Sequence, residues 1–259
     1  MTLPIRRLLP ALFAALVLAL LHVVPAHAQI NLAWNDCITQ PNAAENISYA
    51  CDGSRNGTPF KAVVSFVSPI DMPGFVAMFA EVDLYMGHYP DDSPSAVLPD
   101  YWRLANGECR VGNFGYPEPL SGIGTGLTGP CQNPWKGAFS AASFIRTEMR
   151  YSTPWPGHVQ ILFDLALNAP TSIVGGQQYV AGVFSLDTWK DVDTGDGACA
   201  GCCEPMYLLC SLLRLNQAGY TPTQIELTAP ATRSHIGWLG CMQTPIRNRT
   251  WGSIKATYR

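Results

Sequence analysis

The chain of 259 residues is 47% hydrophobic and 14% charged, and its 16 Lys and Arg against 19 Asp and Glu give a net charge of −3. This apolar content excludes an intrinsically disordered chain, and the mild acidity leaves no basic surface to attract nucleic acid. A coiled coil is excluded as well, because Ala, Glu, Lys, Leu and Arg do not dominate the composition.

Residues 1–28 have the three parts of a secretory signal peptide: a basic start, an apolar run over Leu8–Val24 and a small-residue site ending at Ala28. We predict cleavage before Gln29 and a mature protein that is secreted, periplasmic or on the cell surface. Pro10 and His22 interrupt the apolar run, and no later stretch reaches the roughly 18 apolar residues of a membrane helix. We therefore predict no membrane span after cleavage.

Strand patterns begin at Lys61–Val67 and continue in Phe75–Met86. The even positions of the second segment are all apolar, whereas its odd positions turn acidic at Glu81 and Asp83. We expect one face of this strand in the core throughout, and the other face to emerge into solvent halfway along.

Apolar residues also recur at every second position in parts of the second half of the chain. We predict that Ala141–Tyr151 is a strand paired with His158–Leu165 through a turn rich in proline, with a helix as the alternative for the first segment. Met206–Leu215 is apolar on both faces, which favours a central strand or a buried helix. The remaining strand candidates are Tyr179–Leu186 and Gln224–Thr228.

Many short strands with no long amphipathic helix predict an all-β fold, an antiparallel two-sheet sandwich of jelly-roll or immunoglobulin-like type with long loops. The longest irregular stretch covers residues 87–137. No repeat or low-complexity linker divides the chain, so residues 29–259 are predicted to form one domain.

Nine cysteines in an exported chain predict disulfide bonds. Proximity in sequence suggests the pairs Cys37–Cys51 and Cys109–Cys131. The C-terminal group would form two bridges and leave one thiol, with a zinc or redox role for its Cys-x-x-Cys pair as the alternative. This group, whose connectivity the sequence leaves open, is Cys199, Cys202, Cys203, Cys210 and Cys241.

Aromatic residues in predicted loops are the candidate ligand-binding residues, because an exposed ring stacks on the apolar face of a sugar. Burial in the core is the alternative for each of them. The candidates are Tyr101, Trp102, Trp135 and Trp155, and Trp189 lies in a similar position.

Two acidic groups suggest further chemistry. Glu81 and Asp83 lie two apart on one strand face, roughly 7 Å apart, which is compatible with the carboxyl pair of a glycoside hydrolase. Asp191, Asp193 and Asp196 lie in a glycine-containing loop that suits calcium, although the spacing departs from an EF-hand and a solvated turn is the alternative. No other cofactor is predicted.

Segments 31–37, 197–202 and 250–259 resemble those of a group of uncharacterised secreted proteins of environmental bacteria. The resemblance implies export and a cysteine-stapled β domain, and it implies no activity. The chain has neither a Gly-x-Ser-x-Gly nor a His-Glu-x-x-His motif. We therefore expect a non-enzymatic secreted or surface protein that binds a glycan or another envelope component, with a carbohydrate-active enzyme as the alternative.

Overall fold

The computed structural model describes residues 28–38, 40–53, 59–86, 97–112, 114–115, 131–135, 144–151, 157–192, 198–219, 223–228 and 234–241. These residues form strands, one 3-10 turn (η2, Asp100–Trp102) and connecting loops. Among them, no helix is long and apolar enough to cross a membrane. Nearly all of the predicted signal peptide lies outside the described residues.

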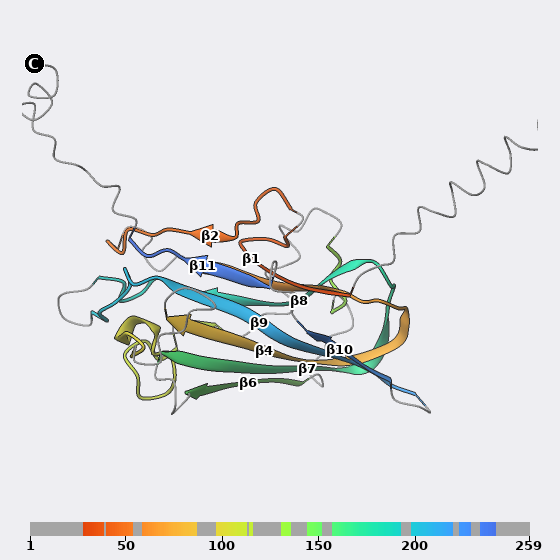
Figure 1. The fold of residues 1–259 in the computed structure, drawn as a ribbon. Helices are drawn as coiled ribbons and strands as arrows, with labels where there is room; N and C mark the ends of the chain where they lie inside the picture. Colours follow the sequence, from red (N-terminus) through yellow and green to blue (C-terminus); the bar gives the residue numbers. More distant parts are fainter. Residues whose placement is uncertain are drawn as a thin grey trace, which may run out of the picture.

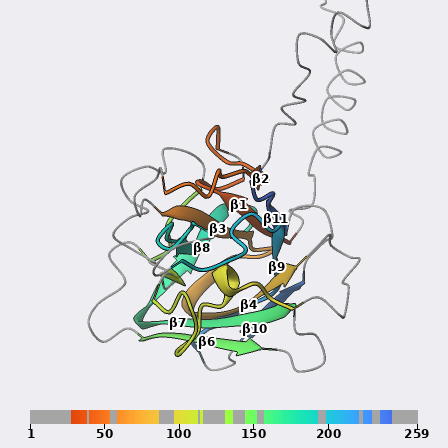
Figure 2. The ribbon, with the colours of Figure 1, turned by 90° about the vertical axis from the view of Figure 1, so that its left-hand side faces the viewer.

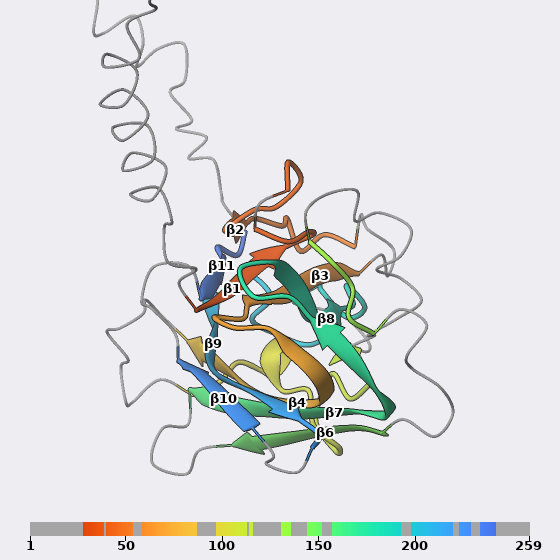
Figure 3. The same cartoon turned by 90° about the vertical axis from the view of Figure 1, so that its right-hand side faces the viewer.

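The strands form two sheets that pack face to face, as Figures 1, 2 and 3 show from three sides. The smaller sheet has the order β1 (Gln29–Trp34), β3 (Phe60–Val67), β8 (Gln178–Leu186) and β5 (Phe114–Gly115). The larger sheet has the order β2 (Asn46–Ile47), β11 (His235–Trp238), β9 (Met206–Gln217), β4 (Met72–Met86), β7 (His158–Ile173) and β6 (Phe144–Tyr151), with β10 (Thr223–Thr228) beside β9. The predicted two-sheet β-sandwich is confirmed.

Strand pairing follows the sequence pattern closely. β6 pairs with β7 in an antiparallel register, and β9 lies between β11 and β4. The two segments with a helix as the alternative, now β6 and β9, are therefore strands. The pairing of β11 with β2 is parallel, in a sheet that is otherwise antiparallel. One detail was wrong: the register shifts between Phe75 and Ala77, and this bulge turns Phe75 into the core in place of Val76.

Aromatic side chains fill the space between the sheets. Phe163 on β7 meets Phe184 on β8 edge to face, with ring centroids 4.9 Å apart. A larger cluster surrounds the fully buried Trp238, whose indole Nε1 donates a hydrogen bond to the carbonyl of Cys202 at 2.8 Å. The rings around Trp238 are Trp34, Tyr49, Phe60, Tyr101 and Trp102.

Four disulfides are present, and their pairing differs from both explicit predictions. The bridges are Cys37–Cys131, Cys51–Cys202, Cys109–Cys199 and Cys203–Cys241. Proximity in sequence misleads here, because the sheets bring together cysteines as far as 151 positions apart. The prediction of two bridges within the C-terminal group is wrong: Cys203–Cys241 lies within it, whereas Cys199 and Cys202 pair with cysteines outside it. The one thiol that this group leaves, as predicted, is the buried Cys210.

We expect Phe163→Ala to lower the free energy of unfolding by about 3–5 kcal/mol, because it empties a fully buried site between the sheets. Equilibrium denaturation with urea measures the change. The exposed Gln224→Ala on β10 serves as the control and should stay within about 0.5 kcal/mol of the unmodified protein. An equal effect of the two substitutions would contradict this assignment of the core.

Candidate functional site

Three of the four aromatic candidates lie in the core. Tyr101, Trp102 and Trp135 are at most 1% exposed, so the prediction that they present a flat ring to a ligand is wrong. Trp155 lies outside the described residues. Trp189, by contrast, is 56% exposed and is the tryptophan that the described part of the chain offers to solvent.

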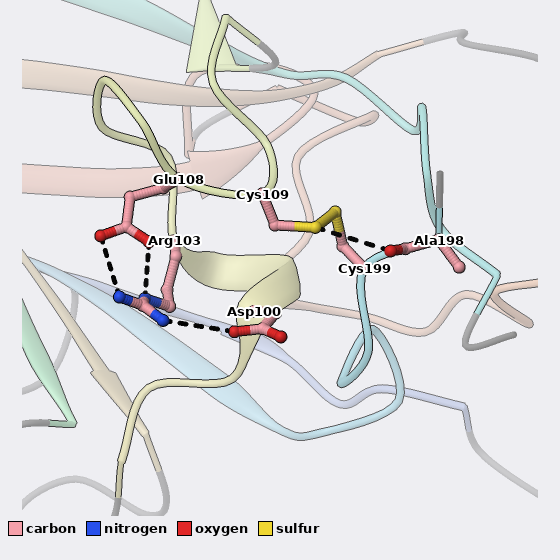
Figure 4. A network of polar contacts seen from close by, with 6 residues as sticks. All are labelled: Asp100, Arg103, Glu108, Cys109, Ala198 and Cys199. Atoms are coloured by element: carbon pink, nitrogen blue, oxygen red, sulfur yellow. Dashed lines mark hydrogen bonds and ion pairs between the residues drawn. A yellow bond between two sulfur atoms is a disulfide. The ribbon is translucent and has the colours of Figure 1, made fainter. Parts of the chain in front are cut away.

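Tyr101 and Trp102 are buried because the loop that carries them folds back onto the sandwich. Arg103 forms ion pairs with Glu108 at 2.8 Å and Asp100 at 3.4 Å, beside the Cys109–Cys199 bridge, as Figure 4 shows. The buried Arg110 guanidinium lies 3.7 Å from the centre of the Tyr101 ring. The predicted Cys109–Cys131 bridge across this irregular stretch is wrong, because Cys109 is bonded to Cys199 and Cys131 to Cys37.

A hollow of about 410 Å³ opens where β7 passes into β8. Its volume lies within the range of small-molecule sites. The described residues that line it carry amide, hydroxyl and aliphatic side chains, and none of them is Asp, Glu, Lys, Arg or His. The lining residues are Gln132, Asn133, Pro134, Thr171, Ser172, Val174, Gln177 and Tyr179.

One wall of the hollow is the segment 131–135, which is fixed at both ends. The Cys37–Cys131 disulfide holds its start, and the buried Trp135 holds its end by donating a hydrogen bond from Nε1 to the Ala181 carbonyl at 3.1 Å. Between them, the backbone of Gln132 pairs with β8 through two hydrogen bonds of 2.8 Å. This wall behaves as an added strand rather than as a free loop.

The opposite wall is the turn 174–177, which packs against the turn between β3 and β4. The amide of Gly175 donates to Asp71 Oδ1 at 2.7 Å, and the amide of Gly176 donates to the Ser68 carbonyl at 2.9 Å. A Cβ atom on Gly175 would lie 2.8 Å from the carbonyl carbon of Ile70, so only glycine permits this approach. The hollow therefore has two walls in fixed positions.

A second polar group lies on the outer face of the larger sheet, around Asp83. His158 Nε2 lies 2.9 Å from Asp83 Oδ1, and the Ser211 hydroxyl donates to Asp83 Oδ2 at 2.6 Å. The register of β4 and β9 shifts at Ser211, and this bulge adds a hydroxyl beside the carboxylate. Asp83 is consequently 5% exposed, and the prediction that it emerges into solvent is wrong.

This arrangement differs from a serine hydrolase triad. The imidazole must lie between serine and carboxylate to take the hydroxyl proton, whereas here the carboxylate lies between Ser211 and His158. Glu81 lies next to this group, and Gln160 donates to its carboxylate at 3.3 Å. Burial, followed by the charge of Asp83, raises the pKa of Glu81, despite the opposing effect of nearby arginines.

Of the predicted calcium loop, the structure describes only Asp191 and Val192. The carboxylate of Asp191 is buried and accepts hydrogen bonds from the Tyr49 hydroxyl and from the Gly53 amide, so it ties the segment around Cys51 to the end of β8. Asp193 and Asp196 lie outside the described residues, and calcium binding stays a prediction.

The raised pKa of Glu81 can be tested through the dependence of folding stability on pH. Because its pKa is raised, the folded state binds the carboxyl proton more tightly than the unfolded state does. The ionised carboxyl of Glu81 therefore lowers the free energy of unfolding as pH rises through the folded-state pKa. We expect Glu81→Gln to raise the free energy of unfolding at neutral pH, and this gain should vanish below about pH 4, where the carboxyl is protonated in both states. Denaturation at a series of pH values measures the difference.

Glu226 provides the matched control for this test. It lies on β10 and forms an exposed ion pair with Arg214 at 3.0 Å. Its charge is the smallest of the causes that raise the pKa of Glu81, so Glu226→Gln should give a much smaller gain at neutral pH. A gain for Glu226→Gln equal to that for Glu81→Gln would show that the effect reports overall charge instead of the environment of Glu81.

Comparisons with known proteins do not assign the chain to a family or a function. No family model matches the chain, and no curated protein matches it. Among solved structures, the cohesin module of a family 33 glycoside hydrolase from Clostridium perfringens aligns over 78% of this chain and 98% of its own length, with 8% identity and a TM-score of 0.29. A likeness this weak carries no conclusion about function, and the resemblance to uncharacterised secreted bacterial proteins stays a prediction.

Proposed function

We propose that the protein is exported and binds a neutral glycan in the hollow between the 131–135 segment and the 174–177 turn. The observation that carries this proposal is the uncharged polar lining of a hollow large enough for one or two sugar rings. We propose binding without chemical conversion, because none of the described lining residues carries a carboxyl or imidazole group that would act as an acid or base.

The lining matches the chemistry of a sugar. Each sugar hydroxyl both donates and accepts hydrogen bonds, and the side-chain amides of Gln132, Asn133 and Gln177 carry both kinds of group. Two of these amides also make contacts within the protein: Asn133 Oδ1 accepts from the Trp135 amide at 2.9 Å, and Gln177 Nε2 donates to the Gln178 carbonyl at 3.2 Å. Val174 is 57% exposed and supplies an aliphatic surface for the C–H face of a ring. The described lining residues include no cation that would pair with an acidic polysaccharide, so the expected ligands are uncharged.

Fixed walls also favour binding, since a preformed site loses little conformational entropy when it takes a ligand. The disulfide at Cys131 and the glycine contact at Gly175 hold the two walls before any ligand arrives. Export is supported by the four disulfides, which form and persist in oxidising compartments.

The test is calorimetric titration of the mature protein with a panel of neutral oligosaccharides derived from glucans, xylans and mannans, with an acidic polygalacturonate fragment as the charged comparison. We expect at least one neutral ligand to bind and the acidic one not to. Gln132→Ala and Gln177→Ala should each weaken binding by about tenfold, which corresponds to the loss of one hydrogen bond. Gln132 is suited to truncation because its backbone alone makes the pairing with β8.

Trp189→Ala is the discriminating control. Trp189 follows the end of β8, whereas the hollow lies at its start, roughly 30 Å away along a strand of nine residues. Binding that survives Trp189→Ala but weakens in the glutamine variants supports the hollow. Loss of binding in Trp189→Ala alone would move the site to the exposed tryptophan, and a panel without any neutral ligand would refute the proposal.

Glycan hydrolysis by Glu81 and Asp83 is the second candidate, and the raised pKa of Glu81 favours it, because a general acid must hold its proton. Against it, both oxygens of Asp83 are engaged by His158 and Ser211. The same panel tests this candidate through the release of reducing ends. Release that Glu81→Gln abolishes would establish a hydrolase in place of a binding protein.

A further inference from the structure

Three segments far apart in sequence meet at one corner of the sandwich and bring four cysteines together. They are the residues after β2, the loop before β9 and the residues after β11. The Tyr49 amide donates to the Gly240 carbonyl at 3.2 Å, and the Leu239 amide donates to the Ile47 carbonyl at 2.8 Å. These backbone hydrogen bonds place Cys51 beside Cys241.

The third segment is held equally closely. Gly240 has a φ of +67°, and a Cβ atom at that position would lie 1.9 Å from the Cys203 carbonyl oxygen, so the two backbones touch where only glycine fits. On the other side, the Trp238 indole holds the Cys202 carbonyl. The adjacent residues Cys202 and Cys203 thus have fixed positions between Cys51 and Cys241.

The two disulfides at this corner share one sulfur cluster. Cys51 is bonded to Cys202, and Cys203 is bonded to Cys241. The Sγ atoms of Cys51, Cys203 and Cys241 all lie within 4.8 Å of one another. Within the described residues, no second trio of thiol, carboxylate or imidazole side chains lies this close together.

The two bridges differ in their access to solvent. Cys51 and Cys202 are 8% and 0% exposed, whereas Cys203 and Cys241 are both half-buried at the surface. An external thiol consequently reaches the Cys203–Cys241 bridge first. Either sulfur released from this bridge already lies within 4.8 Å of Cys51 Sγ.

We propose that these four cysteines form a thiol–disulfide exchange centre that reacts with external dithiols. In the first step, a dithiol reduces the Cys203–Cys241 bond, becomes a disulfide itself and leaves two thiols on the protein. In the second step, the thiolate of Cys203 or Cys241 attacks Cys51 Sγ, forms a new disulfide with it and expels Cys202 as a thiolate. The second step consumes no reductant, because one S–S bond forms as one breaks.

Single variants isolate the second step. Cys203→Ser leaves Cys241 as the attacking thiol, and Cys241→Ser leaves Cys203. Each oxidised protein is incubated at mildly alkaline pH, where the thiolate forms, then quenched with acid, alkylated with N-ethylmaleimide in denaturant and mapped by mass spectrometry. We expect, in at least one variant, Cys51 bonded to the remaining outer cysteine and Cys202 alkylated.

Cys203→Ser gives the clearest reading, because a peptide linking Cys51 to Cys241 cannot be confused with the original Cys51–Cys202 pair. In Cys241→Ser, fragmentation must distinguish the adjacent Cys202 and Cys203. The matched control is Cys109→Ser, which frees Cys199 at a bridge outside the cluster and should leave Cys51–Cys202 intact. Cys210 is free in the folded protein and is alkylated in every sample.

A titration of the unmodified protein with dithiothreitol under native conditions tests the first step. If the variants do not fold, this titration by itself tests both steps of the proposed exchange. Cys203–Cys241 should be lost first, and Cys51 should then appear paired with Cys203 or Cys241. An intact Cys51–Cys202 pair as the sole product in both variants and in this titration would overturn the proposal, as would earlier reduction of the buried Cys37–Cys131 bridge. Neither result bears on glycan binding.

Discussion

Covalent connection between distant parts of the chain is the constraint on which both candidate sites depend. Three of the four disulfides join residues at least 90 positions apart, and each fastens a loop to the sandwich. A bridge across so long a loop removes much of the freedom of the unfolded chain, by roughly 4–5 kcal/mol in the chain-entropy model. Segments without regular structure thereby form fixed walls, such as the one that begins at Cys131.

Glycine supplies the complementary constraint, because the fastened segments approach more closely than side chains allow. Gly175 lets the turn beside the hollow touch the turn between β3 and β4, and Gly240 lets the end of β11 touch Cys203. At both positions the contact is backbone against backbone, so a neighbouring side chain cannot rotate away to make room. The hollow and the sulfur cluster are therefore both built from close contacts of the main chain.

Most strands were predictable from local pattern, whereas β1, β2, β5, β11 and the sites were not. Alternation in Met206–Leu215 and His158–Leu165 reports which side of a strand is buried, and burial is a property of each segment. The position of Ser211 beside Asp83 depends instead on a bulge, which alters register without any local signal in the sequence. The same limit applies to Cys51, whose disulfide partner is 151 residues away in sequence. It applies as well to Trp102, which lies in a predicted loop but is buried in the core.

The two candidate sites use different bridges, which makes their responses to reduction separable. The wall of the hollow depends on Cys37–Cys131, whose cysteines are 0% and 5% exposed. The exchange centre opens at Cys203–Cys241, which is fastened to β11 and the loop before β9. A thiol that reduces only the half-buried Cys203–Cys241 bridge acts on the larger sheet and leaves the Cys37–Cys131 bridge of the smaller sheet closed. Rearrangement of sulfurs at one corner is thus compatible with an unchanged ligand site at the other end of β8.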